Sequence, residues 1–364
     1  GVTALTNTSG FRATGHHLHR QHRAAGGHDQ LDTPAVTART FPDAALGPDH
    51  PNTMSARNNL AGAYQDASEW GRAIPLFEQT LADRERILDN DDPNLLASRN
   101  NLAAAYQTAG EVGQAIPLFE RTLADCARVL GVDHPKTLVA QENLGAAYRD
   151  AGETGRAITL LEQTVADCER AFGVDHPNTL ASRNSLAVTF RVAGDLGRAI
   201  PLFEHTLADR ERILDADHPD TQDSRNDLAV AYRAARDFGR AIPLFNRTLA
   251  DRERTLGADH PKTLAAQDNL AATYQAAGDL AQAVPLFERA LEGFERVLTG
   301  DHPDTLRARN NLAAAYRDAG NLPRAILLFE SALADCVRIF GVDHPNTRTV
   351  QRNLEGAQQH GDPT

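Results

Sequence analysis

A repeat with a fixed step of 42 residues is the strongest constraint on the fold of this 364-residue chain. The tripeptide Asp-His-Pro returns at the same place in each unit, and Asp92 replaces the histidine in one of them. No insertion or deletion interrupts the step. A strict period of this size predicts stacked units that bury their apolar faces against one another. The histidines of the repeat are His50, His134, His176, His218, His260, His302 and His344.

Each unit contains two apolar stripes at helical spacing, separated by a short polar turn. Residues three, four and seven apart share one face of a helix. Pro51 suits the first turn of a helix, where its missing N–H is not needed. We therefore expect helix A over about 51–66 and helix B over about 70–88. In the first unit the stripes are Leu60 and Tyr64, then Ile74, Phe77, Leu81 and Leu88.

These residues resemble the tetratricopeptide repeat, whose 34-residue pattern is W-x2-L-G-x2-Y…A-x3-F…P. Leu60 and Tyr64 are followed at the family's spacing by Ala73 and Phe77. The next proline, Pro93, comes eight residues after the position at which the pattern closes. The unit is therefore similar to a tetratricopeptide repeat whose helix B is longer by about two turns.

The 42-residue form, with "NNLAxxY" and "LGxDHP", resembles the repeats of kinesin light chain and of many bacterial arrays over about 46–358. The resemblance implies an all-α fold, a right-handed superhelical solenoid of antiparallel helix pairs, with the A helices along its concave face. We expect seven helical hairpins in 46–344, and a capping helix and tail in 345–364. The family also implies a protein- or peptide-binding scaffold.

One position departs from the family, because arginine or glutamine replaces the large aromatic residue near the start of helix A. Helical geometry places this residue about 60° from Leu60. We expect a structural role in which the aliphatic stem lies on the core and the guanidinium reaches out to solvent. The residues are Arg57, Arg99, Arg183, Arg225 and Arg309, with Gln141, Gln267 and Gln351.

Asparagines recur on the opposite face of helix A, although asparagine is a poor residue for a helix interior. A carboxamide both donates and accepts hydrogen bonds. The resemblance implies that a ladder of them holds the backbone of an extended peptide. Hydrogen bonding between neighbouring A helices is a second interpretation, and the two are compatible. The first row is Asn59, Asn101, Asn143, Asn269, Asn311 and Asn353, and the second is Asn58, Asn100, Asn184, Asn226 and Asn310.

A further row on the same face becomes basic in the middle of the array, at Arg149, Arg191 and Arg233. Positive charge there would favour an acidic segment of a bound peptide. The alternative is that these arginines are solvated surface.

Catalytic and metal-binding roles have little support. The Asp-His pair occurs seven times, whereas a catalytic pair is normally unique. Stacked copies about 10 Å apart cannot share a metal whose histidine ligands lie within about 2.1 Å. Phosphate-binding, GxSxG and HExxH motifs are missing from the sequence. We therefore expect no enzymatic activity, no cofactor and no metal site.

The composition limits partner and compartment. The formal net charge of −12 argues against a nucleic-acid backbone as the partner. The apolar runs are too short to cross a membrane. Cys126, Cys168 and Cys336 share one repeat position, so stacking keeps Cys126 and Cys168 too far apart for a disulfide. Few, unpaired cysteines favour a cytoplasmic location.

The two ends differ from the array. Residues 1–45 contain five histidines but no repeat pattern. An irregular or disordered linker, or a decayed repeat, is the favoured interpretation, and weak metal binding is the alternative. Gly1 is not a start methionine, and Met54 is the only Met. The chain is therefore expected to be a piece of a longer protein, or one that is processed or numbered from an internal point. This motivates a second functional hypothesis, a sensor or regulatory arm of a larger bacterial signalling protein such as an NTPase.

Overall fold

The computed structural model describes residues 46–67, 69–298 and 300–359, and the expectations for residues 1–45 lie outside this part of the chain. The described residues form α-helices and no strands. They divide into two compact units, residues 46–193 and residues 194–359, and each is described by itself.

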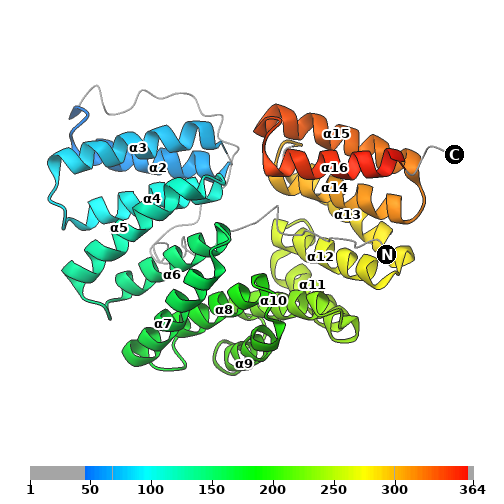
Figure 1. The fold of residues 1–364 in the computed structure, drawn as a ribbon, viewed down its shortest axis with the longest axis horizontal. Helices are drawn as coiled ribbons and strands as arrows, with labels where there is room; N and C mark the ends of the chain where they lie inside the picture. The colour runs from blue at the N-terminus through cyan, green and yellow to red at the C-terminus, as the bar shows by residue number, and fades with distance from the viewer. Residues whose placement is uncertain (1–45, 68, 299, 360–364) are drawn as a thin grey trace. The chain divides into compact units, whose positions relative to one another are not determined.

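The helices of the first unit alternate as the repeat predicts, with a shorter helix A before each longer helix B (Figure 1). Helix A of the first repeat has the bounds predicted from the sequence, and helix B ends one residue earlier than predicted. The helices are α2 (Pro51–Asp66), α3 (Trp70–Ile87), α4 (Pro93–Thr108), α5 (Val112–Leu130), α6 (Pro135–Asp150), α7 (Thr154–Phe172) and α8 (Pro177–Val192).

The second unit begins with a helix B and ends with a helix A. The helices are α9 (Leu196–Leu214), α10 (Pro219–Ala234), α11 (Phe238–Leu256), α12 (Pro261–Ala277), α13 (Leu280–Val297), α14 (Pro303–Asp318), α15 (Leu322–Phe340) and α16 (Pro345–Gln359). The last of them, α16, buries Val350, Leu354 and Ala357 against the core and exposes polar residues such as Arg352 and Glu355.

The repeated Asp-His-Pro sequence forms the start of helix A. The Nδ1 of His50 accepts a hydrogen bond from the backbone N–H of Asn52 at 3.1 Å, which caps the helix. Asp92 caps α4 in the same way, through Oδ1 and the N–H of Asn94 at 2.7 Å. A carboxylate oxygen replaces the imidazole nitrogen because both accept a hydrogen bond at an N-cap.

The aspartate of the same tripeptide pairs with an arginine near the end of helix B of its own repeat. Asp91, for example, lies 2.5 Å from Arg128. The pair joins the turn before helix A to the end of helix B and so closes the hairpin at one end. The pairs are Asp49–Arg86, Asp91–Arg128, Asp133–Arg170, Asp217–Arg254, Asp259–Arg296 and Asp301–Arg338.

The core of each unit is built from small and large residues in alternation. In α2 and α3, Ala61 and Ala73 are fully buried, and Phe77 lies between the two helices' apolar faces. Small residues let the helices approach closely, and the aromatic ring fills the space that remains.

No helix in the described part of the chain is long and apolar enough to cross a membrane.

The third repeat changes this packing by a paired substitution. Glycine and leucine, Gly145 and Leu161, stand where the six other hairpins have alanine and phenylalanine. A Cβ added at Gly145 would lie 2.7 Å from the side chain of Leu161. The leucine therefore occupies space that alanine fills elsewhere.

We predict that Gly145→Ala destabilises the protein, because the new methyl group overlaps Leu161 and overpacking costs about 1–3 kcal/mol. Adding Leu161→Phe restores the pair found in the other hairpins and should recover stability. Urea unfolding of the two single variants and the double variant measures the coupling. Purely additive effects of the two substitutions would contradict the paired packing.

Candidate functional site: the inner face of the A helices

Neighbouring A helices within a unit lie side by side, and their asparagines form hydrogen-bonded rungs between repeats. In each rung the Nδ2 of one asparagine donates to the Oδ1 of the asparagine one repeat and one residue earlier. Asn143, for example, donates to Asn100 at 2.9 Å. The other rungs between asparagines are Asn101 to Asn58 at 3.2 Å, Asn269 to Asn226 at 3.2 Å and Asn353 to Asn310 at 3.0 Å.

The interpretation of the asparagines as ties between repeats is therefore confirmed. A rung uses one N–H of the later carboxamide and one lone pair of the earlier one. The later carboxamide keeps its second N–H and its oxygen, and the earlier one keeps its NH2 group. The rungs hold these remaining groups in fixed orientations, and the residues of the first row lie half-buried or, at Asn59, exposed.

Two rungs are made by other residues with the same polarity. The hydroxyl of Ser185 donates to Glu142 at 2.7 Å, beside the half-buried Asn184 on α8. In the second unit Asn311 donates to the carboxylate of Asp268 at 3.0 Å. Each described rung thus has an acceptor on the earlier helix and a donor on the later one.

Asp268 differs from the other acceptors because it is a buried acid, 4% exposed. Its nearest cation is Arg307, whose Nε lies 3.8 Å away and which also pairs with Asp304. Burial raises the pKa of the Asp268 carboxyl, although Arg307 and Asn311 act in the opposite direction. In the sequence, the only sign that Asp268 is unusual is that an aspartate stands in a row of asparagines.

The three arginines of the basic row lie in different surroundings. Arg149 is 8% exposed and pairs with Asp150 at 3.3 Å, so the expectation of solvated surface is wrong for it. Burial of a long cation is tolerated here because a carboxylate accompanies it. Arg233 donates to the backbone oxygen of Asn269 at 3.2 Å, and Arg191 is half-buried on α8.

Most of the arginines that replace the family's aromatic residue are buried to their guanidinium groups, and Arg183 is half-buried. Arg99 and Arg225 are 0% exposed, so the expectation that these groups reach solvent is wrong. Arg99 lies 2.7 Å from Asp125 of its own helix B and 3.4 Å from Glu85 of the preceding helix B. The two carboxylates offset the cost of desolvating the cation. The structural role predicted for these residues is confirmed.

In two repeats the arginine of helix A and the glutamate of the preceding helix B are replaced together. Gln141 stands where the preceding helix has Ala127 instead of glutamate, and Gln351 follows Val337 in the same way. Gln267 is an exception, and its buried Nε2 has no hydrogen-bond partner among the described residues. Arginine is thus mostly used where two carboxylates are available.

A tyrosine on helix A adds a second polar contact between repeats. Its sequence pattern predicted only a place in the apolar core. The hydroxyl of Tyr148 donates to Glu120 of the preceding helix B at 2.6 Å. Arg156 stacks on the same ring, with its guanidinium 4.0 Å from the centroid. Burial is the largest cause that raises the pKa of Tyr148, to about 12. The equivalent pairs are Tyr106–Glu78, Tyr232–Glu204 and Tyr316–Glu288.

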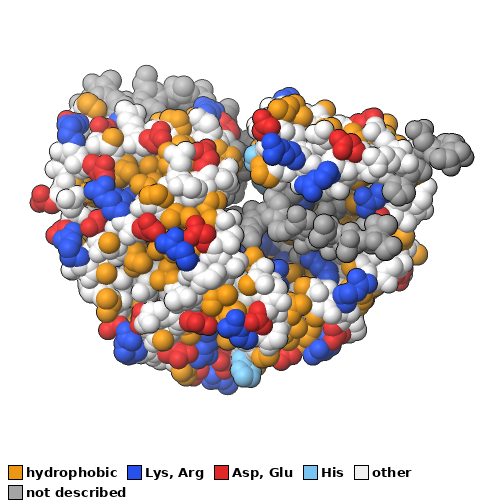
Figure 2. Space-filling model, in the orientation of Figure 1, with side chains coloured by type: hydrophobic (Ala, Val, Ile, Leu, Met, Phe, Trp, Pro, Cys, Tyr) orange, Lys and Arg blue, Asp and Glu red, His pale blue; other side chains and the backbone are white. Residues whose placement is uncertain are grey.

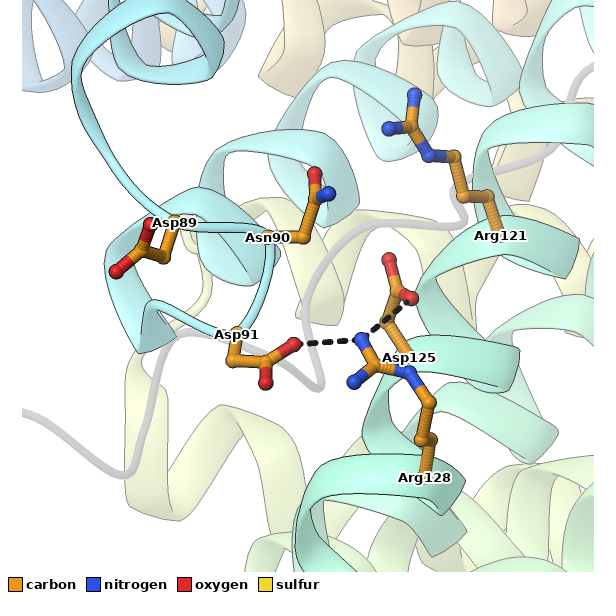
Figure 3. A pocket seen from close by; sticks show the side chains of 6 residues that line it. All are labelled: Asp89, Asn90, Asp91, Arg121, Asp125 and Arg128. Carbon is orange, nitrogen blue, oxygen red and sulfur yellow. Dashed lines mark hydrogen bonds and ion pairs between the residues drawn. The ribbon is translucent and has the colours of Figure 1, made fainter.

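The turn between α3 and α4 borders a shallow hollow of about 640 Å³ (Figure 3). Arg128 points toward Asp91 and Asp125, at 2.5 and 3.2 Å, and Arg121 pairs with Glu85 at 3.1 Å. Both arginines at this site are therefore paired with carboxylates. On the face seen in Figure 2, basic and acidic side chains are interspersed.

The cysteines form no disulfide, as predicted for Cys126 and Cys168. All three thiols, including Cys336, are free and buried. Burial raises the pKa of Cys336 to about 11, which makes its thiolate rare at neutral pH. No group of residues in the described ranges has the arrangement of a metal site.

The fold, with stacked pairs of antiparallel helices, defines a helical-repeat protein. The sequence profile of the tetratricopeptide repeat matches residues 53–128, 94–168, 156–212, 190–254, 220–296 and 265–336. The chain belongs to the tetratricopeptide repeat family, with repeats of the kinesin-light-chain type. This fold generally serves as a non-enzymatic scaffold for protein–protein interactions.

Several solved structures share the fold. A single-residue variant of a Podosopora anserina protein classed as kinesin light chain, with nearly identical TPR-like repeats, is 33% identical, covers 56% of this chain and 97% of its own, and has a TM-score of 0.50. BtubC (BKLC) from P. vanneervenii is 22% identical, covers 62% and 91%, and has a TM-score of 0.52. A Rap protein complexed with Competence and Sporulation Factor is 10% identical, covers 87% and 82%, and has a TM-score of 0.54. The search of curated proteins found no match.

The buried arginine Arg99 leads to a prediction on stability. Arg99→Gln removes the buried cation between Glu85 and Asp125, which keep only their contacts with the exposed Arg121 and Arg128, and should lower the free energy of unfolding by about 3 kcal/mol. Adding Glu85→Ala reproduces the Gln141–Ala127 combination and should recover part of the loss. Chemical denaturation measures both variants. Arg86→Gln, at an exposed pair, is the control and should cost much less. Equal losses in Arg99→Gln and in the double variant would contradict the pairing.

The buried acid leads to a second prediction. Asp268→Asn should increase the stability at pH 7, because a carboxamide carries no charge to desolvate. The folded-state pKa of Asp268 lies above the usual 3.8. The folded chain therefore keeps this proton to higher pH than the unfolded chain, and stability falls as pH rises from 3.8 through the raised pKa.

The gain from Asp268→Asn should accordingly be small near pH 3 and larger at pH 7, which urea unfolding at both pH values measures. Asn226→Asp, at the equivalent place of the rung to Asn269, is the matched control and should have the opposite sign. An Asp268→Asn variant less stable than the parent at pH 7 would show that the contact with Arg307 outweighs burial.

Proposed function

We propose that the protein is a non-enzymatic scaffold that binds an extended peptide along the inner face of its A helices. The observation that carries the proposal is the row of half-exposed carboxamides held in register by the rungs. Each rung between two asparagines leaves an N–H donor and oxygen acceptors, and the hydrogen bond of the rung orients these groups. The backbone of an extended peptide presents the same two kinds of group at regular intervals.

The spacing of the helices supports an extended ligand. Packed helices lie about 8–10 Å apart, and an extended chain advances about 3.3 Å per residue. About every third residue of a peptide would therefore meet a new rung. Each unit has three described rungs, so each would hold a segment of about nine residues.

Mostly small side chains lie one helical turn after the second asparagine row, on the same face of helix A, where a peptide backbone would approach the helices. They come from one position of helix A, four residues after the second asparagine row, and are Gly62, Ala104, Ala146, Val188, Val230, Ala272, Ala314 and Gly356. Arg191 and Arg233 are half-buried at the same face, and we place them beside acidic side chains of the ligand. Arg149 belongs to the same basic row and is paired with Asp150.

A displayed library of twelve-residue peptides, selected on the full chain, tests the proposal. The tightest synthetic peptide is then titrated by fluorescence anisotropy against the parent and against Asn101→Ala/Asn143→Ala. Each lost hydrogen bond is worth about 1 kcal/mol, so we expect binding to weaken about tenfold or more.

Asn90→Ala and Asn246→Ala, at exposed positions outside the inner face, are the controls and should bind as the parent does. Circular dichroism should show unchanged helical content in all variants. If selected peptides bind Asn101→Ala/Asn143→Ala with parental affinity, the rungs serve only to tie the repeats together.

A further inference from the structure

Helix α2 differs from the other A helices in the face that it leaves uncovered. Ala63 is exposed, and Leu60 and Tyr64 are half-buried. The equivalent alanines in four later repeats are fully buried, and the equivalent leucine in α4 is 4% exposed. Those alanines are Ala105, Ala147, Ala231 and Ala315. The difference lies on one side of the helix, because Ala61 on the other side is 0% exposed.

The later repeats show what covers this face. Helix B of the preceding repeat packs on each of α4 and α6, and α9 packs on α10 in the second unit. Its glutamate meets the tyrosine of helix A, as Glu78 of α3 meets Tyr106. Its apolar side faces the same small residues, since Leu81 of α3 and Ala105 of α4 belong to one core cluster.

Tyr64 keeps only part of this arrangement. Its hydroxyl is bonded to Arg72, and the guanidinium of Arg72 lies 3.9 Å from the ring centroid. At the equivalent Tyr148, the hydroxyl contacts both the arginine and the glutamate of the preceding helix. Helix α2 thus presents half of an interface whose other half is known from the same chain.

We propose that this face of α2 binds an amphipathic helix of a partner protein, with the side-chain pattern of a helix B. The partner helix places a glutamate against the Tyr64 hydroxyl and a leucine or phenylalanine over Leu60 and Ala63. This surface is separate from the inner face of the A helices. The occupant is defined by continuity with the α3–α4 interface, which has the same polarity and the same apolar contacts.

An N-acetylated, C-amidated peptide with the sequence of α3, residues 70–87, is the probe. We expect it to bind the full chain in a fluorescence titration, weakly because an isolated helix of this length is marginal in water. A peptide with Glu78→Lys should bind about tenfold less tightly, since a hydrogen bond to a charged group is lost.

Ala63→Arg, at an exposed position, should abolish binding of the peptide without changing the melting temperature. The control Ala82→Arg, also at an exposed position, should bind normally. Tyr64→Phe should remove the preference for Glu78 over Lys in the peptide, and the control Tyr106→Phe should retain it. Binding that is insensitive to Ala63→Arg, or no binding at submillimolar peptide, would overturn the proposal.

Thiol labelling decides whether residues of the chain itself take the place of the partner. The native cysteines are buried and react slowly, so Ala63→Cys reports on its own surroundings. Rapid labelling by a maleimide, with Ala105→Cys protected, is the expected result. Protection of Ala63→Cys in the isolated full chain would assign the face to the chain's own residues and overturn binding in trans.

Discussion

A guanidinium buried between two carboxylates joins three helices, and where a repeat carries this arginine the contact fixes how that repeat packs on the one before it. Arg99 belongs to one helix A, Asp125 to its helix B, and Glu85 to the helix B before it. A buried cation is stable only where its charge and its N–H groups are matched. Neighbouring hairpins therefore pack in one register, which in turn aligns the tyrosine–glutamate contacts and the asparagine rungs.

The rungs place a structural and a binding role on the same residues. Each asparagine spends one hydrogen-bonding group on its neighbour and retains others. In the six described rungs an acceptor on the earlier helix is followed by a donor on the later one, and the pairs Glu142–Ser185 and Asp268–Asn311 keep this polarity with different chemistry. A bound peptide would meet groups that are already oriented, which lowers the entropy lost on binding.

The first and last described A helices, α2 and α16, differ in the kind of face that they expose. On α16 the outer face carries exposed polar residues such as Arg352 and Glu355. Helix α2 keeps an apolar face with an aromatic hydroxyl at its edge. The same residue types are buried in later repeats, so the difference arises from position in the stack and not from composition.

The repeat period, the helix bounds and the start of helix A at a proline followed from the sequence, because they depend on local spacing and on backbone geometry within a few residues. His50 and Asp92 act through the N–H two residues away, which any copy of the turn provides. The surroundings of Arg57, Arg99 and Arg149 were not predictable in this way. Helical geometry gives the side on which a residue lies, but the carboxylates that bury it come from other helices. The 42-residue step thus determined the fold, and only the packing of one hairpin on the next decided which charges are buried, which asparagines are paired and which face of α2 stays open.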